Sequence, residues 1–140
     1  IVLLSPTGSG KTLAFLLPIV EKLQLEVREV QAVIIVPSRE LAIQIETVFK
    51  KMGTIYKINA CYGGHQTRTE INNLSSPPAI LVGTPGRLAV HIRENSFATN
   101  QVTMIALDEF DKALEMGFQK DMSFIINSFK NLNFKNVTIC

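Results

Sequence analysis

The sequence predicts an α/β domain with a mostly parallel sheet and helices on both faces. Short apolar runs alternate about five times with longer stretches in which apolar residues recur with helical period. The runs are apolar throughout rather than alternating, which is typical of strands buried between two helix layers. The chain has 140 residues, 46% hydrophobic and 19% charged, which suits one domain with a core and excludes a disordered chain.

The first half of the chain supplies three strands and three helices. We expect strands at 1–4, 32–37 and 57–62, and helices at 13–24, 38–52 and 67–74. Pro18 should kink the first helix, because proline lacks the backbone N–H of a helix interior. The second helix places an apolar face along its length and suits a stop at Gly53.

The second half continues the pattern. Strands are expected at 79–83, 102–107 and 137–140. A helix over 85–94 has Thr84 as a plausible N-cap. Residues 111–132 predict one long helix or two short ones, broken near Gly117.

The segment SPTGSGKT at 5–12 lies between the first strand and the first helix. Its glycines allow a tight turn, and the helix that follows presents its positive N-terminal end to an anion. Lys11 can reach the β- and γ-phosphates of a nucleotide, and the Thr12 hydroxyl can bind Mg²⁺. The alternative, a glycine-rich surface turn with an incidental lysine, is less favoured because the strand–loop–helix context is complete. The expected phosphate-binding residues are Thr7, Gly8, Ser9, Gly10, Lys11 and Thr12.

The segment LDEFD at 107–111 follows an apolar strand with three carboxylates. The strand would carry Asp108 to the carboxyl edge of the sheet, where ligands bind in open α/β folds. Asp108 would then hold Mg²⁺, and Glu109 would orient or deprotonate the attacking water. An exposed acidic turn is the alternative. Together with the phosphate loop, the pattern favours an ATPase site whose catalytic residues are Lys11, Asp108 and Glu109.

Five motifs, SPTGSGKT, PSRELA (37–42), GG (63–64), TPGR (84–87) and DEFD (108–111), occur in the order and approximate spacing of the DEAD-box RNA helicases. The chain resembles the first of that family's two RecA-like domains over nearly its whole length. The resemblance implies a P-loop NTPase that uses ATP and Mg²⁺ and contacts the RNA backbone without reading its sequence. The implied RNA-binding residues are Pro37, Ser38, Arg39, Gly63, Gly64, Thr84, Pro85, Gly86 and Arg87.

The residues themselves agree with this implied RNA surface. Two of the motifs open helices, and helix N-termini bind phosphate without reading bases. For an isolated Arg39 or Arg87, a surface salt bridge is the alternative. The net charge of +2 is slight, so a nucleic-acid surface has to be a local patch.

Several single residues carry their own expectations. By resemblance, Asp111 couples the acidic cluster to the second domain. The family usually has Ala where Phe110 stands, and we expect its ring to pack inward beside Ala106 or Ala113. His65 and His91 are expected to be exposed. Cys61 is expected to be a buried strand thiol, and the two cysteines predict no disulfide scaffold.

Both ends of the sequence look cut, and the family's adenine-reading motif, its Ser-Ala-Thr motif and its second domain lie outside residues 1–140. We therefore expect this piece alone to bind nucleotide and RNA weakly and to lack appreciable turnover, since losing an arginine finger costs about 10³–10⁵ in rate. No apolar stretch approaches the length of a membrane span, and we expect a cytoplasmic protein without membrane association. Two alternatives are another P-loop NTPase, such as a DNA translocase, and a non-catalytic helicase-like module that binds RNA or protein.

Overall fold

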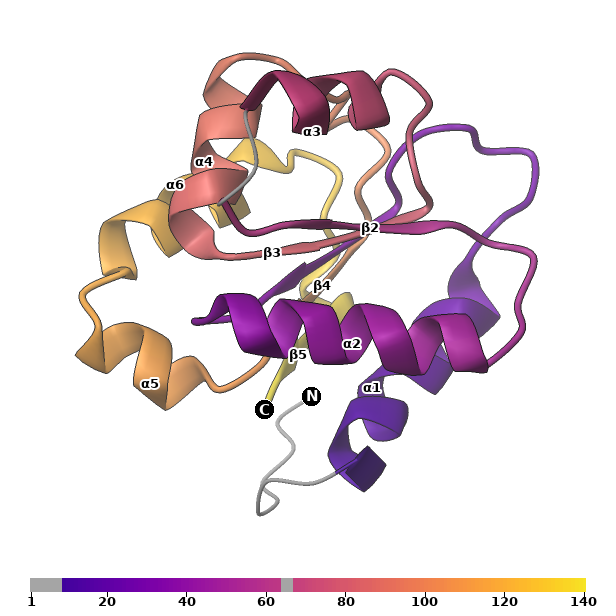
Figure 1. Ribbon diagram of the computed structural model, residues 1–140, viewed down its shortest axis with the longest axis horizontal. Helices are drawn as coiled ribbons and strands as arrows, with labels where there is room; N and C mark the ends of the chain where they lie inside the picture. The colour runs from indigo at the N-terminus through magenta and orange to yellow at the C-terminus, as the bar shows by residue number, and fades with distance from the viewer. Residues whose placement is uncertain (1–8, 64–66) are drawn as a thin grey trace.

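The computed structural model describes residues 9–63 and 67–140. Within them, five strands form one parallel sheet in the order β2-β3-β1-β4-β5 (Figure 1). The strands are β1 (Ala32–Ile35), β2 (Ile58–Cys61), β3 (Ile80–Gly83), β4 (Met104–Leu107) and β5 (Val137–Ile139). Each lies within a predicted strand. The strand expected at 1–4 lies outside the described residues.

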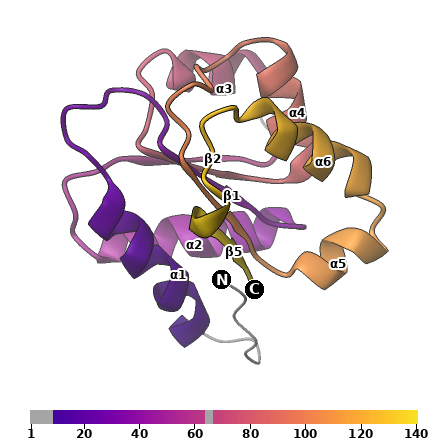
Figure 2. The same cartoon turned by 180° about the vertical axis from the view of Figure 1, so that it is seen from behind.

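Helices cover both faces of this sheet, as predicted (Figures 1 and 2). On one face lie α1 (Ser9–Lys22) and α2 (Arg39–Lys51). On the other face lie α3 (Thr67–Leu74), α4 (Pro85–Arg93) and α6 (Gln119–Ser128), with the short α5 (Phe110–Glu115) beside them. A 3₁₀ turn, η1 (Phe134–Asn136), leads into β5.

The central strand β1 shows why the apolar runs do not alternate. All four of its residues are buried. Val33 and Ile35 belong to the core beneath α3, α4 and α6, whereas Ala32 and Ile34 belong to the core beneath α1 and α2. Since burial of each large aliphatic side chain contributes roughly 1.5–3 kcal/mol, both faces of the strand stabilise the fold.

Glycines follow the ends of two helices, α2 and α5, whereas Pro18 does not end α1. Gly117 has φ +81°, a conformation that favours glycine, and it separates α5 from α6 within the predicted 111–132 segment. Gly53, with φ +67°, follows the last turn of α2 in the same way. Pro18 lies inside α1 and does not end it, and the kink expected there stays a prediction.

Parallel strands bring their carboxyl ends to one edge of the sheet. At that edge, the chain continues from β1 into Pro37, from β2 into Gly63, from β3 into Thr84 and from β4 into Asp108. Motifs that are far apart in the sequence therefore share one end of the domain. No helix among the described residues is long and apolar enough to cross a membrane.

Candidate functional site

The acidic cluster begins directly where β4 ends. The Asp108 N–H donates to the Ile35 carbonyl at 2.9 Å, so the pairing of β4 with β1 extends one residue beyond the strand. Glu109 then adopts φ +54° and ψ +46°, a left-handed conformation that costs a non-glycine residue about 1–3 kcal/mol. This turn leaves both acids buried, at 5% and 8% exposed. The structure therefore excludes the exposed acidic turn.

Lys11 meets both acids from the first turn of α1. Its Nζ lies 3.0 Å from Asp108 Oδ1 and 3.5 Å from Glu109 Oε1. Burial alone lowers the pKa of this lysine, but its close contacts with the two carboxylates and their attraction outweigh burial and raise it. Sequence reasoning assigned all three residues to one site but missed this direct contact. The two segments are nearly a hundred residues apart, and only the fold brings them together.

Asp108 Oδ1 lies close to the Lys11 ammonium but forms no well-aligned hydrogen bond with it. The atom is buried, and no donor among the described residues meets hydrogen-bonding geometry with it. The contact at 3.0 Å is therefore an ion pair whose alignment is poor. A buried carboxylate oxygen that lacks an aligned donor can accept a further cationic partner.

The phosphate-loop residues that the structure describes start α1. Ser9, Gly10, Lys11 and Thr12 form its first turn, which presents backbone N–H groups that have no partner within the helix. A Cβ placed on Gly10 would meet no atom of residues 9–63 or 67–140 within 4 Å, so these residues leave room for a ligand to approach the backbone there. Thr7 and Gly8 lie outside the described residues.

The two residues that follow LDE, Phe110 and Asp111, differ in burial. Asp111 is exposed in the first turn of α5, and its expected coupling to a second domain stays a prediction. Phe110 is half-buried against the core that contains Ala113, which agrees with the expected inward packing on that side. Ala106 belongs to the opposite core. That Phe110 leaves the geometry of the neighbouring carboxylates undisturbed stays a prediction.

The segment at 37–39 begins α2. Ser38 is its N-cap, and the hydroxyl oxygen accepts from the Leu41 N–H at 3.3 Å. Arg39 is exposed, and its guanidinium carbon lies 5.2 Å from the centre of the Tyr62 ring. This stacking aligns an arginine from the start of α2 with the end of β2.

The segments at 63 and 84–87 lie beside it. Gly63 has φ +73° just after β2, and Gly64 lies outside the described residues. Thr84 occupies the N-cap position of α4 with Pro85 after it, as predicted, but its hydroxyl makes no capping hydrogen bond. Gly86 and Arg87 complete the first turn of α4, so two helix N-termini lie at the same edge of the sheet.

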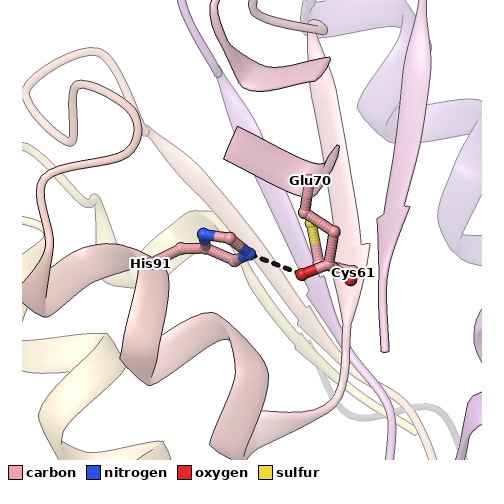
Figure 3. Close-up of side chains that lie close together, drawn as sticks. All are labelled: Cys61, Glu70 and His91. Atoms are coloured by element: carbon pink, nitrogen blue, oxygen red, sulfur yellow. Dashed lines mark hydrogen bonds and ion pairs between the residues drawn. The ribbon is translucent and has the colours of Figure 1, made fainter. Parts of the chain in front are cut away.

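Arg87 forms an ion pair, but not with a surface acid. Its Nε donates to Glu70 Oε2 at 2.5 Å, and Glu70 is 3% exposed. His91 Nε2 lies 2.7 Å from the same oxygen, and its Nδ1 lies 3.0 Å from Ser96 Oγ. We call these four residues the Glu70 network. Figure 3 shows the His91 ring directed at the Glu70 carboxylate, with Cys61 beside it.

The expectation that His91 is exposed was wrong, since the residue is 0% exposed. It lies one turn after Leu88 on the buried face of α4, and a buried acid supplies the hydrogen bond that the ring needs. Sequence reasoning also missed Glu70. The available signal was spacing, because Glu70 precedes the buried Leu74 by four residues and therefore shares its helix face.

Cys61 completes a trio with Glu70 and His91 whose potential metal-ligating atoms lie within 4.8 Å of one another. The expectation of a buried thiol at Cys61 is confirmed. Burial raises the pKa of that thiol to about 12, which disfavours the thiolate that a metal requires. Two donors, one of them the Arg87 cation, already occupy Glu70 Oε2. Glu70 and His91 are therefore better explained as a hydrogen-bonded pair beside a buried thiol than as ligands of a metal.

Comparison with known proteins decides the family. A family model described as DEAD/DEAH box helicase matches residues 1–140. The chain belongs to the DEAD/DEAH box helicase family. The structure also resembles a crystal structure of a DEAD box protein from the hyperthermophile Methanococcus jannaschii, with a TM-score of 0.89 and 35% identity, over 99% of this chain and 38% of that one. The RecA-like fold that the motifs implied is thereby confirmed.

Relatives within the DEAD-box family are similar over most of this chain. An ATP-dependent RNA helicase CshA of Limosilactobacillus reuteri is 43% identical over 122 residues, which are 86% of this chain and 24% of that protein. The DEAD-box ATP-dependent RNA helicase CshA of Bacillus subtilis (strain 168) is 42% identical over 124 residues, which are 87% and 25%. The chain thus spans about a quarter of the length of these curated relatives.

Proposed function

We propose that this chain is the first RecA-like domain of an ATP-dependent RNA helicase, and that it binds and helps to hydrolyse ATP at the carboxyl edge of its sheet. The observation that carries the proposal is the convergence of Lys11 from α1 with Asp108 and Glu109 from the end of β4. Burying the side chains of a cation and two acids costs desolvation free energy. A purely structural role does not require that cost, so the cluster points to a functional site.

The arrangement assigns a role to each group. Lys11 lies at the start of a helix whose N–H groups favour phosphate, so it can leave the carboxylates and pair with the β- and γ-phosphates. Glu109 would orient or deprotonate the attacking water, a contribution of about 10²–10⁴ in rate. Asp111, exposed nearby, would communicate with a second RecA-like domain of the full-length protein.

Mg²⁺ fits the same site. No donor in the described part of the chain is aligned with the buried Asp108 Oδ1, and hard carboxylate and hydroxyl oxygens are the ligands that Mg²⁺ prefers. Asp108 and Thr12 would hold the ion, directly or through water. When bound, Mg²⁺ would neutralise charge on the transferring phosphate.

RNA would lie across the N-termini of α2 and α4. Both present the positive end of a helix, and Arg39 and Arg87 add positive charge at their first turns. Such contacts grip phosphates and do not read bases, so the sequence of the RNA would matter little. Binding of RNA rather than DNA is supported by the names of the relatives.

The test is ATP hydrolysis by the full-length protein with and without single-stranded RNA. We expect RNA to stimulate the wild type, Lys11→Ala to lose ATP binding, and Glu109→Gln to bind ATP while turnover falls by about 10²-fold or more. Glu115→Gln, an exposed acid on α5, is the matched control and should hydrolyse ATP normally. Full turnover by Glu109→Gln would contradict the assignment. RNA binding by a wild type that lacks any turnover would instead favour the non-catalytic module.

A further inference from the structure

The Glu70 network joins two elements that the proposed RNA surface uses separately. Glu70 lies in α3, which follows the GG segment, and Arg87 lies in the first turn of α4. A single carboxylate oxygen, Oε2, accepts from both Arg87 Nε at 2.5 Å and His91 Nε2 at 2.7 Å. Glu70 is almost completely buried, whereas the Arg87 side chain keeps 19% of its surface exposed. The network thus connects the interior to a charge near the surface.

Glu70 is ionised within this network. Burial by itself raises the pKa of the carboxyl, but hydrogen bonds from His91 and Arg87 outweigh burial and hold the pKa below its usual value. A charged, buried acceptor binds a guanidinium more strongly than a neutral one does. Arg87 is therefore held by a charge on α3 whose Oε2 also accepts from His91 on α4.

His91 in turn is fixed on both sides of its ring. Its Nε2–H donates to Glu70, and its Nδ1 lies 3.0 Å from Ser96 Oγ. Either the serine hydroxyl donates to a neutral ring or a protonated ring donates to the hydroxyl. In both cases Nε2 carries a proton toward Glu70, so the orientation of the carboxylate does not depend on the charge of the ring.

We propose that Glu70 and His91 are positioning residues that hold the Arg87 guanidinium at the N-terminus of α4 in the orientation that grips an RNA phosphate. Arg87 has five N–H donors in a rigid fork, so fixing Nε fixes the plane of the whole group. Neither Glu70 nor His91 contacts RNA in this proposal. The inference rests on the proposed function, because it requires that Arg87 bind RNA.

An opposite outcome is physically reasonable, which makes the proposal falsifiable. A carboxylate beside Arg87 also lowers the local positive potential and could compete with a phosphate for the guanidinium. Under competition, loss of the Glu70 charge strengthens RNA binding. Under positioning, the same loss weakens it, because the guanidinium then samples several rotamers and no longer reaches the phosphate in much of the bound population.

The experiment measures the affinity of the full-length protein for single-stranded RNA at several salt concentrations, with a non-hydrolysable ATP analogue present. We expect Arg87→Ala to weaken binding by about tenfold, the contribution of one charge-assisted hydrogen bond. It should also lower the slope of log affinity against log salt by about 0.7, the value for one phosphate contact on a single strand. Glu70→Gln should change both quantities in the same direction, with affinity falling at least about threefold.

The salt slope separates positioning from a general loss of stability, since only a lost phosphate contact changes it. In the Arg87→Ala background, Glu70→Gln should have no further effect on affinity or slope. Glu46→Gln is the matched control, a partly exposed acid on α2 paired with Lys50, and it should leave both quantities unchanged. If Glu70→Gln does not fold by circular dichroism, His91→Gln and Ser96→Ala test the same network more gently, and each should lower affinity and slope.

Failures of the two proposals are distinguishable. If Arg87→Ala leaves RNA affinity and salt slope unchanged, the proposed RNA role of Arg87 is wrong. If Arg87→Ala weakens binding but the folded network variants bind RNA as well as or better than the wild type, the positioning role is wrong and the RNA role stands.

Discussion

Replacing Lys11 with Met in the nucleotide-free protein removes the cation that lies between Asp108 and Glu109. At 3.0 Å, two unit charges attract by about 5 kcal/mol at an effective dielectric constant of ~20, and by about 1.4 kcal/mol in bulk water. The side chains of Lys11 and Asp108 are 8% and 6% exposed, so the environment lies between these limits. Desolvation of both charges offsets much of the attraction.

We therefore expect a coupling free energy of about 1–3 kcal/mol between Lys11 and Asp108. Lys11→Met alone should lower the free energy of unfolding by about 3 kcal/mol, since it leaves the buried Asp108 without its cation and Glu109 with only the exposed Lys112, at 3.3 Å, as an ion-pair partner. In the Asp108→Asn background, the same substitution should cost about 1 kcal/mol. The raised pKa of Lys11 means that its contribution is complete below the lysine's ordinary pKa and is lost only as pH rises through the higher folded value. Measurements at pH 7 therefore report the whole effect.

The assay is urea unfolding of the wild type, the two single variants and the double variant, without nucleotide. The matched control is the Glu46–Lys50 pair on α2, whose atoms lie 3.4 Å apart with Lys50 64% exposed. That pair should couple by less than about 0.5 kcal/mol. A Lys11–Asp108 coupling as small as the control's would refute the claim that the lysine rests on the acidic cluster before nucleotide binds.

Two further predictions concern the fold around β3. Gly83→Ala should lower the free energy of unfolding by at least about 2 kcal/mol, because its Cβ would overlap the Cys61 carbonyl oxygen on β2 and crowd Leu88. A Cβ on Gly86 would come no closer than 3.8 Å to Asp121, so Gly86→Ala should change the free energy of unfolding by less than about 1 kcal/mol. Both variants are measured by equilibrium unfolding, and equal losses of stability would argue against this packing at Gly83. The Cys61 thiol, with its pKa raised to about 12, should resist a thiol reagent at pH 8 in folded Cys140→Ser protein and react once urea unfolds it. Rapid labelling of the folded protein would show that the thiol is accessible.

The strands and the chemistry of the motifs were predictable because they depend on local signals. Uninterrupted apolar runs such as 32–35 need helices on both faces, and a parallel sheet then puts the following residues at one edge. The break in the last helical segment was predictable in the same way, because Gly117 there adopts a left-handed φ that favours glycine.

What sequence reasoning missed depends on contacts between distant segments. His91 looks like a polar residue on an exposed helix until Glu70, twenty-one positions earlier, is seen to supply its hydrogen bond in the interior. The ion pair of Lys11 with Asp108 joins the first helix to the end of β4 in the same way. Local sequence patterns show which residues carry charge, but only the folded structure shows which charged side chains are in contact.

The central claim is that ATP bound at this edge of the sheet drives the separation of RNA strands. Its most direct measurement is strand release from a short labelled RNA duplex by the full-length protein, with ATP and Mg²⁺, compared with the Glu109→Gln variant. We expect ATP-dependent release by the wild type, little multiple-turnover release by the variant, and much weaker release from a DNA duplex of the same sequence. Equal release with and without ATP, or a preference for the DNA duplex, would contradict it.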